Sequence, residues 1–266
     1  YVNYYGMANG LPLDDPESGF DPKHPFKNRD PRFYHDIVFD GFQYINTTIA
    51  KEDPDYQFKY VQMYSGSNLR SSSDNGCRTG YYCQKLVPHQ ANKYDGMYNW
   101  GGALQCDLPY MRLADIYLMY AEAGAAAQGA TYKSSKCNLT AEDAINVLRD
   151  RVEAGHVAAK FAADQHKFMD EVRRERAVEL AFEGFRWNDL QRWLLLTEYP
   201  YNIKTSQEFK RVGDYDFTKN DPRDAEVTGW SEKTIVTRDF TEKHYLLPLK
   251  EDDVYLYPEF GQNPGW

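Results

Sequence analysis

The chain has 266 residues, which is enough for one large domain or two small ones. Its formal net charge is −9, and no run of Lys and Arg is present that would neutralise nucleic-acid phosphates or attach to an anionic membrane. No apolar segment approaches the roughly 20 residues of a membrane-spanning helix. These features argue against a nucleic-acid-binding protein and an integral membrane protein. The sequence opens without Met or a signal peptide, so we interpret it as a mature fragment or a truncated chain.

Residues 1–108 are predicted to be an ordered, loop-rich subdomain that faces the ligand. Prolines recur every few residues between positions 12 and 31, which prevents long helices. The alternating segments 36–40 and 57–64 are the two places where strands are expected. The many aromatic residues argue against disorder.

Residues 109–198 are predicted to be helical, with tetratricopeptide-like helix pairs. Apolar residues recur at helical spacing across residues 112–128, where several alanines permit close packing of a second helix. Thr140, with Asp143 three residues later, predicts a capped helix start, and Asp164 predicts another. Residues 199–266 are expected to return to loop and to pack back on the helices, all within one domain.

A dense run of charge follows Asp170. Glu179 and Glu183 lie four residues apart, so they share a helix face. A pair of carboxylates can hold a metal or act as acid and base, but the Glu-x-x-His motif of di-iron bundles is missing. We interpret the segment as a structural network in which Arg176, Arg186 and Arg192 supply the positive charge.

No catalytic motif is recognisable, so we predict that the protein is not an enzyme and has no cofactor or metal. The sequence contains no nucleophile elbow, phosphate-binding loop, dinucleotide-binding glycine pattern or zinc-protease motif. The spacing of the four cysteines matches no zinc site. Free thiols and a Cys77–Cys83 disulfide both remain open.

Aromatic residues beside amides form the predicted binding surface. The chain has 22 Tyr, 14 Phe and 5 Trp. Their rings can fill a core, but on exposed loops they can stack on the apolar faces of sugars while neighbouring amides bond the hydroxyls. Glycines on both sides of residues 97–100 would let the backbone lift a ring clear. The predicted ligand-binding residues are Tyr4, Tyr5, Tyr94, Tyr98, Asn99 and Trp100.

Four segments of the sequence resemble the SusD/RagB family. The first is NRDPR (28–32), preceded by NGLP (9–12) and followed by DG (40–41). The second and third are the long segments RLADIYLMYAEA (112–123) and ERAVELAFEGFRWNDLQRW (175–193). The fourth comprises LPL (247–249) and the terminal QNPGW (262–266). They occur in family order and cover nearly the whole chain.

The resemblance implies a mainly α-helical, SusD-like fold and a surface lipoprotein of the outer membrane. Such a protein captures oligosaccharides or polysaccharides and delivers them to a TonB-dependent, SusC-like transporter. Family members are about twice as long, so the resemblance implies that this chain is the C-terminal half and that the lipid anchor lies outside it. A peptide-binding family member and a non-binding helical scaffold remain as alternatives.

Overall fold

The computed structural model describes residues 1–71, 76–88, 90–96, 108–257, 259 and 261–266. The chain divides into two compact units. Unit 1 comprises Tyr1–Gly184 and Gln207–Ser231, and unit 2 comprises Phe185–Ser206 and Glu232–Trp266. The boundary between the units crosses the two longest strands of the described residues.

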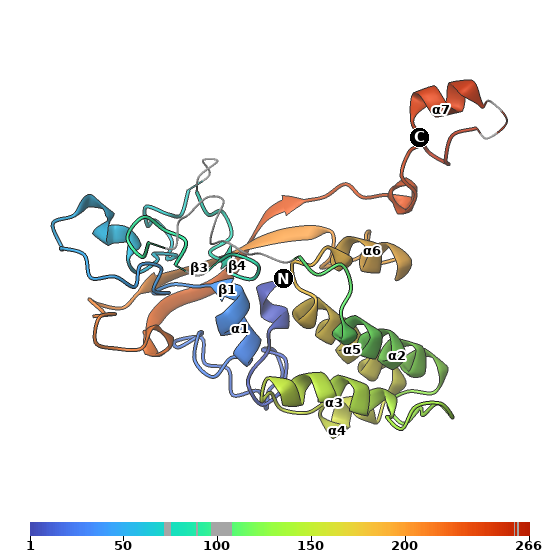
Figure 1. Cartoon of the computed structure of the whole chain (residues 1–266), viewed down its shortest axis with the longest axis horizontal. Coiled ribbons are helices and arrows are strands. Elements are labelled where there is room, and N and C mark those ends of the chain that lie inside the picture. The colour runs from blue at the N-terminus through green and yellow to red at the C-terminus, as the bar shows by residue number, and fades with distance from the viewer. Residues whose placement is uncertain (72–75, 89, 97–107, 258, 260) are drawn as a thin grey trace. The chain divides into compact units, whose positions relative to one another are not determined.

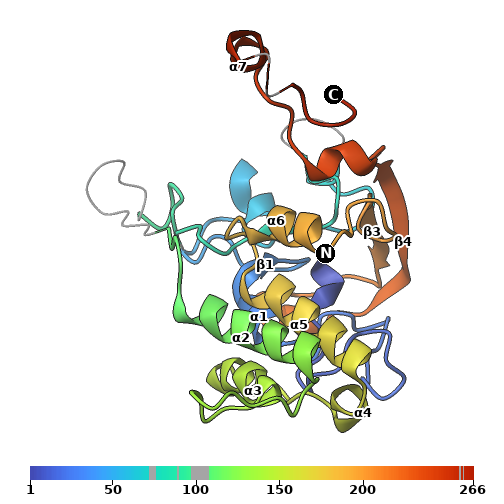
Figure 2. The ribbon, with the colours of Figure 1, turned by 90° about the vertical axis from the view of Figure 1, so that its right-hand side faces the viewer.

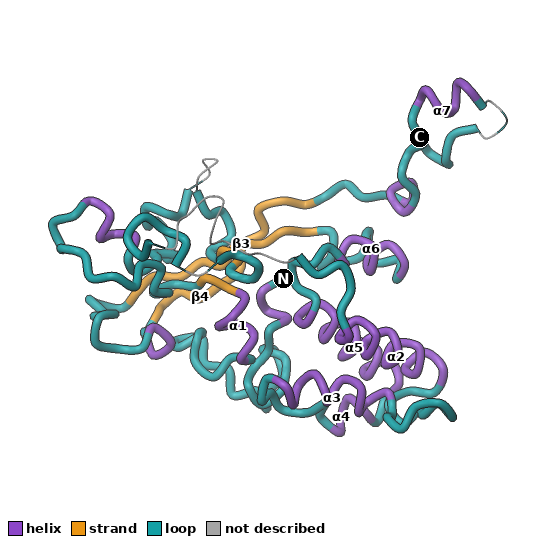
Figure 3. Tube along the Cα trace, viewed as in Figure 1, coloured by secondary structure: helices purple, strands orange, loops and turns teal. Residues whose placement is uncertain are grey.

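The first part of unit 1 consists mainly of loops, as predicted (Figure 3). Helix α1 (Pro31–Asp36) leads directly into the short strand β1 (Ile37–Val38), which pairs antiparallel with β2 (Tyr82–Cys83). The strand expected within residues 36–40 is therefore present. The strand expected at residues 57–64 does not form: a 3₁₀ helix occupies Pro54–Phe58, and Tyr60 makes only an isolated antiparallel bridge with Gln43. A proline at the first position favours such a helical turn.

Four helices follow in unit 1: α2 (Leu113–Ala127), α3 (Ala141–Arg151), α4 (Ala159–Ala162) and α5 (Gln165–Glu179). Both predicted caps are confirmed. Thr140 and Asp143 form a reciprocal capping box on α3, and the Asp164 carboxylate accepts hydrogen bonds from two backbone N–H groups at the start of α5. These caps satisfy the N–H groups that a helix start leaves without partners.

Small residues allow α2 to pack closely against α3 and α5, and Figures 1 and 2 show these three helices together. Ala121 and Ala125 of α2 are fully buried against Ala141 and its neighbours on α3. A Cβ atom at Gly124 would lie 2.8 Å from the Ala141 Cβ atom. The alanine-rich sequence of α2 therefore sets the close approach of the helix pair.

Residues 199–266 were expected to be loop, and this prediction is wrong for two strands and for one helix, α7 (Glu251–Leu256). Strands β3 (Ile203–Arg211) and β4 (Val227–Thr237) form a two-stranded sheet. Their mostly polar sequences lack strict apolar alternation, and each strand finds its partner only after a long connection. Unit 2 also contains helices α6 (Phe185–Arg192) and α7 (Glu251–Leu256). No helix in the described part of the chain is long and apolar enough to cross a membrane.

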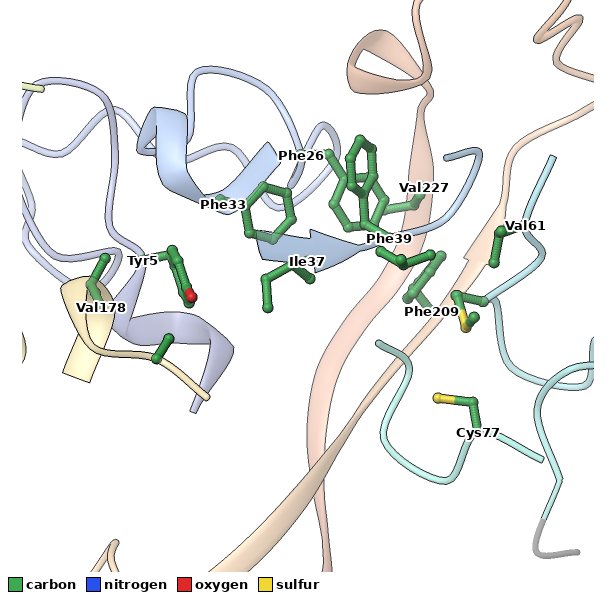
Figure 4. Close-up of a cluster of buried hydrophobic side chains, with 13 residues drawn as sticks. Tyr5, Phe26, Phe33, Ile37, Phe39, Val61, Cys77, Val178, Phe209 and Val227 are labelled. Carbon is green, nitrogen blue, oxygen red and sulfur yellow. The ribbon is translucent and has the colours of Figure 1, made fainter. Parts of the chain in front are cut away.

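The main apolar core of unit 1 joins segments that lie far apart in the sequence (Figure 4). Phe26 and Phe33 stack with their ring centroids 6.4 Å apart, and Phe26 lies edge-to-face with Phe209 of β3. Much of the aromatic content of the loop-rich region therefore fills this core. The loops are held by buried rings rather than by a sheet.

Candidate functional site

Three glutamates of α5, Glu171, Glu175 and Glu179, are buried, and arginines from other elements bind them. Arg149 of α3 bonds Glu175 at 2.9 Å and Glu171 at 3.0 Å. Arg112 bonds both Glu179 and Glu183. Burial opposes the ionised state of Glu175, but Arg32 and Arg149 outweigh it and lower the Glu175 pKa to about 2. This arrangement supports the structural interpretation of the segment.

Among the predicted arginines, Arg192 pairs with an acid of the charged segment, while other cations of the network come from outside the segment. Arg176 binds Asp115 at 2.8 Å, and Arg192 binds Asp189 at 2.8 Å. Arg186 places its guanidinium 5.5 Å from the centre of the Tyr201 ring. The sequence suggested partners on the same helical segment, whereas the glutamates bind side chains from α1, from α3 and from other distant parts of the chain. The side chains that bind Glu175, Glu179 and Glu183 are Arg32, Lys85, Arg112, Arg149 and Arg151.

Tyr5 was predicted to face the ligand, but it belongs to the core. Its side chain is 0% exposed, and its hydroxyl donates to an Asp36 carboxylate oxygen at 2.9 Å. The buried Arg29 guanidinium donates to the Tyr5 backbone carbonyl, which fixes this segment. Because its ring has no open face, Tyr5 is a structural residue. Tyr4 is half-buried against the same core, edge-to-face with Tyr1.

Tyr94 lies in a different cluster, on a loop stabilised by carboxylates. Its hydroxyl donates to Asp53 at 2.9 Å, and Asp55 lies 3.0 Å away. Asp95 accepts backbone hydrogen bonds from Asn46 and Thr47, and these bonds lower the pKa of its carboxyl despite desolvation. The structure therefore separates Tyr94 from Tyr4 and Tyr5. The remaining predicted residues, Tyr98, Asn99 and Trp100, lie outside the described residues.

An open recess of about 390 Å³ on unit 1 has the composition expected of a ligand site. This volume falls within the roughly 300–1,000 Å³ of small-molecule pockets. Aromatic rings and polar side chains line it together. Its lining residues are Tyr34, Phe39, Gly41, Gln43, Tyr60, Phe217, Asn220, Asp221, Pro222 and Arg223. We call it the aromatic pocket.

Two stacked rings form one wall of the aromatic pocket. The Tyr60 and Phe217 ring centroids lie 5.8 Å apart, with the ring planes inclined by 25°. Behind Phe217, the Arg211 guanidinium lies 4.6 Å from the ring centre. Arg211 is itself fixed by the fully buried Asp40, whose carboxylate it contacts at 2.6 Å and 2.9 Å. A buried ion pair and a cation–π contact therefore orient this wall.

Gly41 makes room for the aromatic wall. Its φ of +84° is a left-handed conformation that favours glycine. A Cβ atom built at this position would lie 2.3 Å from Cε1 of Phe217. The Asp40-Gly41 pair thus has two linked roles, because Asp40 positions Arg211 and Gly41 leaves space for the ring.

Polar side chains stand at the rim of the pocket. The Arg223 Nε atom donates to Asp221 at 2.7 Å and 2.9 Å, and this interaction lowers the pKa of the Asp221 carboxyl. The Arg223 guanidinium also lies 5.3 Å from the Tyr34 ring centre. Gln43 and Asn220 add exposed amides. The pocket thus offers hydrogen-bond donors and acceptors beside aromatic faces.

Sequence reasoning missed this pocket because its two halves are far apart in the chain. The lining residues between Tyr34 and Tyr60 are more than 150 positions from those between Phe217 and Arg223, which lie in the connection between β3 and β4. Within the described residues, no group of His, Cys, Asp and Glu is suited to hold a metal ion. Cys77, Cys83 and Cys137 are free thiols, so the Cys77–Cys83 disulfide is not formed.

Comparison with known proteins identifies the family. A family model described as the SusD family matches residues 1–266. The chain belongs to the SusD family. This result confirms the resemblance and the mainly helical SusD-like fold. No curated protein sequence matches this chain.

Solved structures of SusD-like proteins share the fold. A SusD-like protein from Bacteroides fragilis is 25% identical, with a TM-score of 0.69, and the match covers 100% of this chain and 46% of that one. A SusD-like carbohydrate-binding protein from the same organism is 22% identical, with a TM-score of 0.61. That match covers 97% of this chain and 46% of the other. This chain therefore spans less than half the length of the SusD-family structures that it matches.

Proposed function

We propose that this SusD-family protein binds oligosaccharides in the aromatic pocket and performs no chemistry on them. The observation that carries the proposal is the Tyr60–Phe217 wall beside the Asp221–Arg223 pair. Sugar rings combine apolar C–H faces with hydroxyl edges. Aromatic rings can pack against the C–H faces, and paired hydrogen-bond donors and acceptors can bind the hydroxyls.

The wider role follows from the family. A SusD-family protein with this site would hold its glycan at the outer surface of the outer membrane, anchored there by a lipid. A TonB-dependent, SusC-like transporter would then take the glycan up. The carbohydrate-binding description of the Bacteroides fragilis relative supports the ligand class. Copurification of the full-length protein with its transporter tests the partner.

A binding comparison tests the ligand site. Tyr60→Ala removes half of the aromatic wall, so the affinity for the best-binding oligosaccharide should fall about two- to tenfold by calorimetry. Tyr255→Ala is the matched control, since Tyr255 is 84% exposed and does not line the pocket. Equal affinities of the two variants would argue against the pocket.

The absence of catalysis needs its own measurement. The oligosaccharide bound most tightly should remain intact after long incubation with the full-length protein. Chromatography of the incubated sugar would show any cleavage. Turnover that persists through further purification would contradict the proposal.

A further inference from the structure

We propose that the aromatic pocket selects uncharged glycans over anionic ones. The inference rests on the proposed function and names its substrate class. Only two of the ten lining residues carry formal charge, and these are Asp221 and Arg223. Since they pair with each other, the lining has no net charge.

The charges next to the pocket are paired in the same way. Behind the wall, Arg211 binds Asp40 at 2.6 Å. Beside the rim, Lys27 binds Asp224 at 2.7 Å, and Lys219 lies 3.4 Å from Asp216. Four cations thus each have a carboxylate partner. A uronate or sulfate group bound beside any of these cations would also meet the negative charge of the partner carboxylate.

The net charge of the chain also favours neutral ligands over anionic ones. The chain carries a formal net charge of −9. Such a charge disfavours the approach of a polyanion and raises no barrier to a neutral sugar. Selective anion sites in proteins instead gather uncompensated Arg and Lys. The pocket has no such excess among its described neighbours.

The Asp221–Arg223 pair suits neighbouring hydroxyls better than it suits an acid. A hydroxyl both donates and accepts, so one can donate to the carboxylate while the next accepts from the guanidinium. The side chains of Asp221 and Arg223 are 34% and 52% exposed, which leaves both within reach of a ligand. Asp221 also accepts from the Arg223 backbone N–H at 2.9 Å, which fixes the pair at the rim.

The first experiment is a glycan array that displays neutral and anionic oligosaccharides, probed with the full-length protein. We expect the bound ligands to be neutral. Their dissociation constants, measured by calorimetry, should change less than about twofold between low and high salt, because no net charge is neutralised on binding. Selective binding of uronates or sulfated sugars, weakened by salt, would overturn the inference while leaving the proposed function intact.

A conservative variant tests whether the Asp221–Arg223 pair causes the preference for neutral glycans. Asp221→Asn keeps an oxygen that can accept the backbone N–H but leaves Arg223 without its carboxylate. Neutral glycans should bind several-fold more weakly, and anionic ones should gain affinity. Asp170→Asn is the matched control, since Asp170 is an exposed carboxylate of α5 that pairs with Arg173 and lies outside the pocket lining, so it should not change this preference. Identical preferences in the two variants would overturn the inference.

Two further outcomes would reject the inference and the proposed function together. If no glycan binds, both fail together. If the protein retains peptides from a peptide library and no sugar, both fail as well, and the peptide-binding alternative replaces them. The array result and the variant result described above each reject the preference for uncharged glycans while leaving the proposed function intact.

Discussion

The α5 carboxylate network and the aromatic pocket both combine arginines with acids, yet they differ in exposure. Arg149 and Glu175 have side chains only 1% and 2% exposed, and the network connects them to one another. At the pocket rim, the Arg223 side chain is 52% exposed. A buried network uses its hydrogen-bonding capacity internally. An open pair keeps part of that capacity for a ligand.

This difference in exposure distinguishes charged pairs that stabilise the fold from charged pairs that are able to bind a ligand. Removing one member of a buried pair leaves the other charge buried without compensation, which mainly lowers stability. Removing a rim residue leaves its partner in contact with water, so stability changes little and binding changes more. The predictions below follow from that contrast.

The largest effect should come from Arg149→Ala. It leaves Glu171 and Glu175 without a shared partner in the core, and the free energy of unfolding should fall by about 3–5 kcal/mol. Arg151→Ala is the control within the same network, because the Arg151 side chain is 56% exposed. It should cost less than about 1 kcal/mol. Urea unfolding curves measure both, and equal losses would contradict the role of burial.

The second effect is a dependence of stability on pH. The Glu175 pKa is about 2 in the folded state, against an ordinary value of 4.5. Ionised Glu175 therefore stabilises the fold above pH 4.5, and this contribution is lost as the pH falls towards 2. Glu175→Gln should lower stability at neutral pH and flatten the acid decline. The exposed Glu226→Gln should keep the wild-type slope in the same acid titration of unfolding.

A smaller effect, on binding, should follow Gly41→Ala. The new Cβ atom would collide with Phe217, so the aromatic wall must shift and oligosaccharide affinity should fall several-fold. Gly19→Ala is matched in backbone strain, since its φ is +73° and no atom lies within 4 Å of the added Cβ. Both variants should lose about 1–2 kcal/mol of stability. Only Gly41→Ala should weaken binding in calorimetry.

A further test on binding concerns Trp100, which the sequence analysis predicted to bind the ligand. Trp100→Ala should weaken glycan binding several-fold to tenfold, with an unchanged melting temperature, if this ring adds to the binding surface. The reason is the loss of one stacking face. The affinity of the double variant with Trp100→Ala and Tyr60→Ala, compared with that of each single variant, shows whether the two rings contact the same ligand. Wild-type affinity in Trp100→Ala would restrict the site to the aromatic pocket.

The sequence predicted those features whose signals are local. The Thr140–Asp143 capping box, the Asp164 cap and the α2 helix all depend on residues within a few positions of each other. The structural interpretation of the Glu179 segment also held. Its partners could not be predicted, because Arg32 and Arg112 approach from far along the chain.

The site was less predictable because its residues, too, interact with partners that are far away along the chain. Tyr5 stands on a short segment beside glycine and asparagine, like an exposed loop residue, yet Asp36 and Arg29 hold it in the core. Tyr60 and Phe217 are more than 150 positions apart, and only the long connection between β3 and β4 brings them together. One local signal pointed towards the pocket, namely the Asp40-Gly41 pair.

The most direct test is a crystal structure of the full-length protein with its tightest-binding oligosaccharide. Our account predicts one sugar ring against Tyr60 and Phe217, with adjacent hydroxyls hydrogen-bonded to Asp221 and Arg223. A sugar bound at another surface, with the aromatic pocket empty, would contradict it.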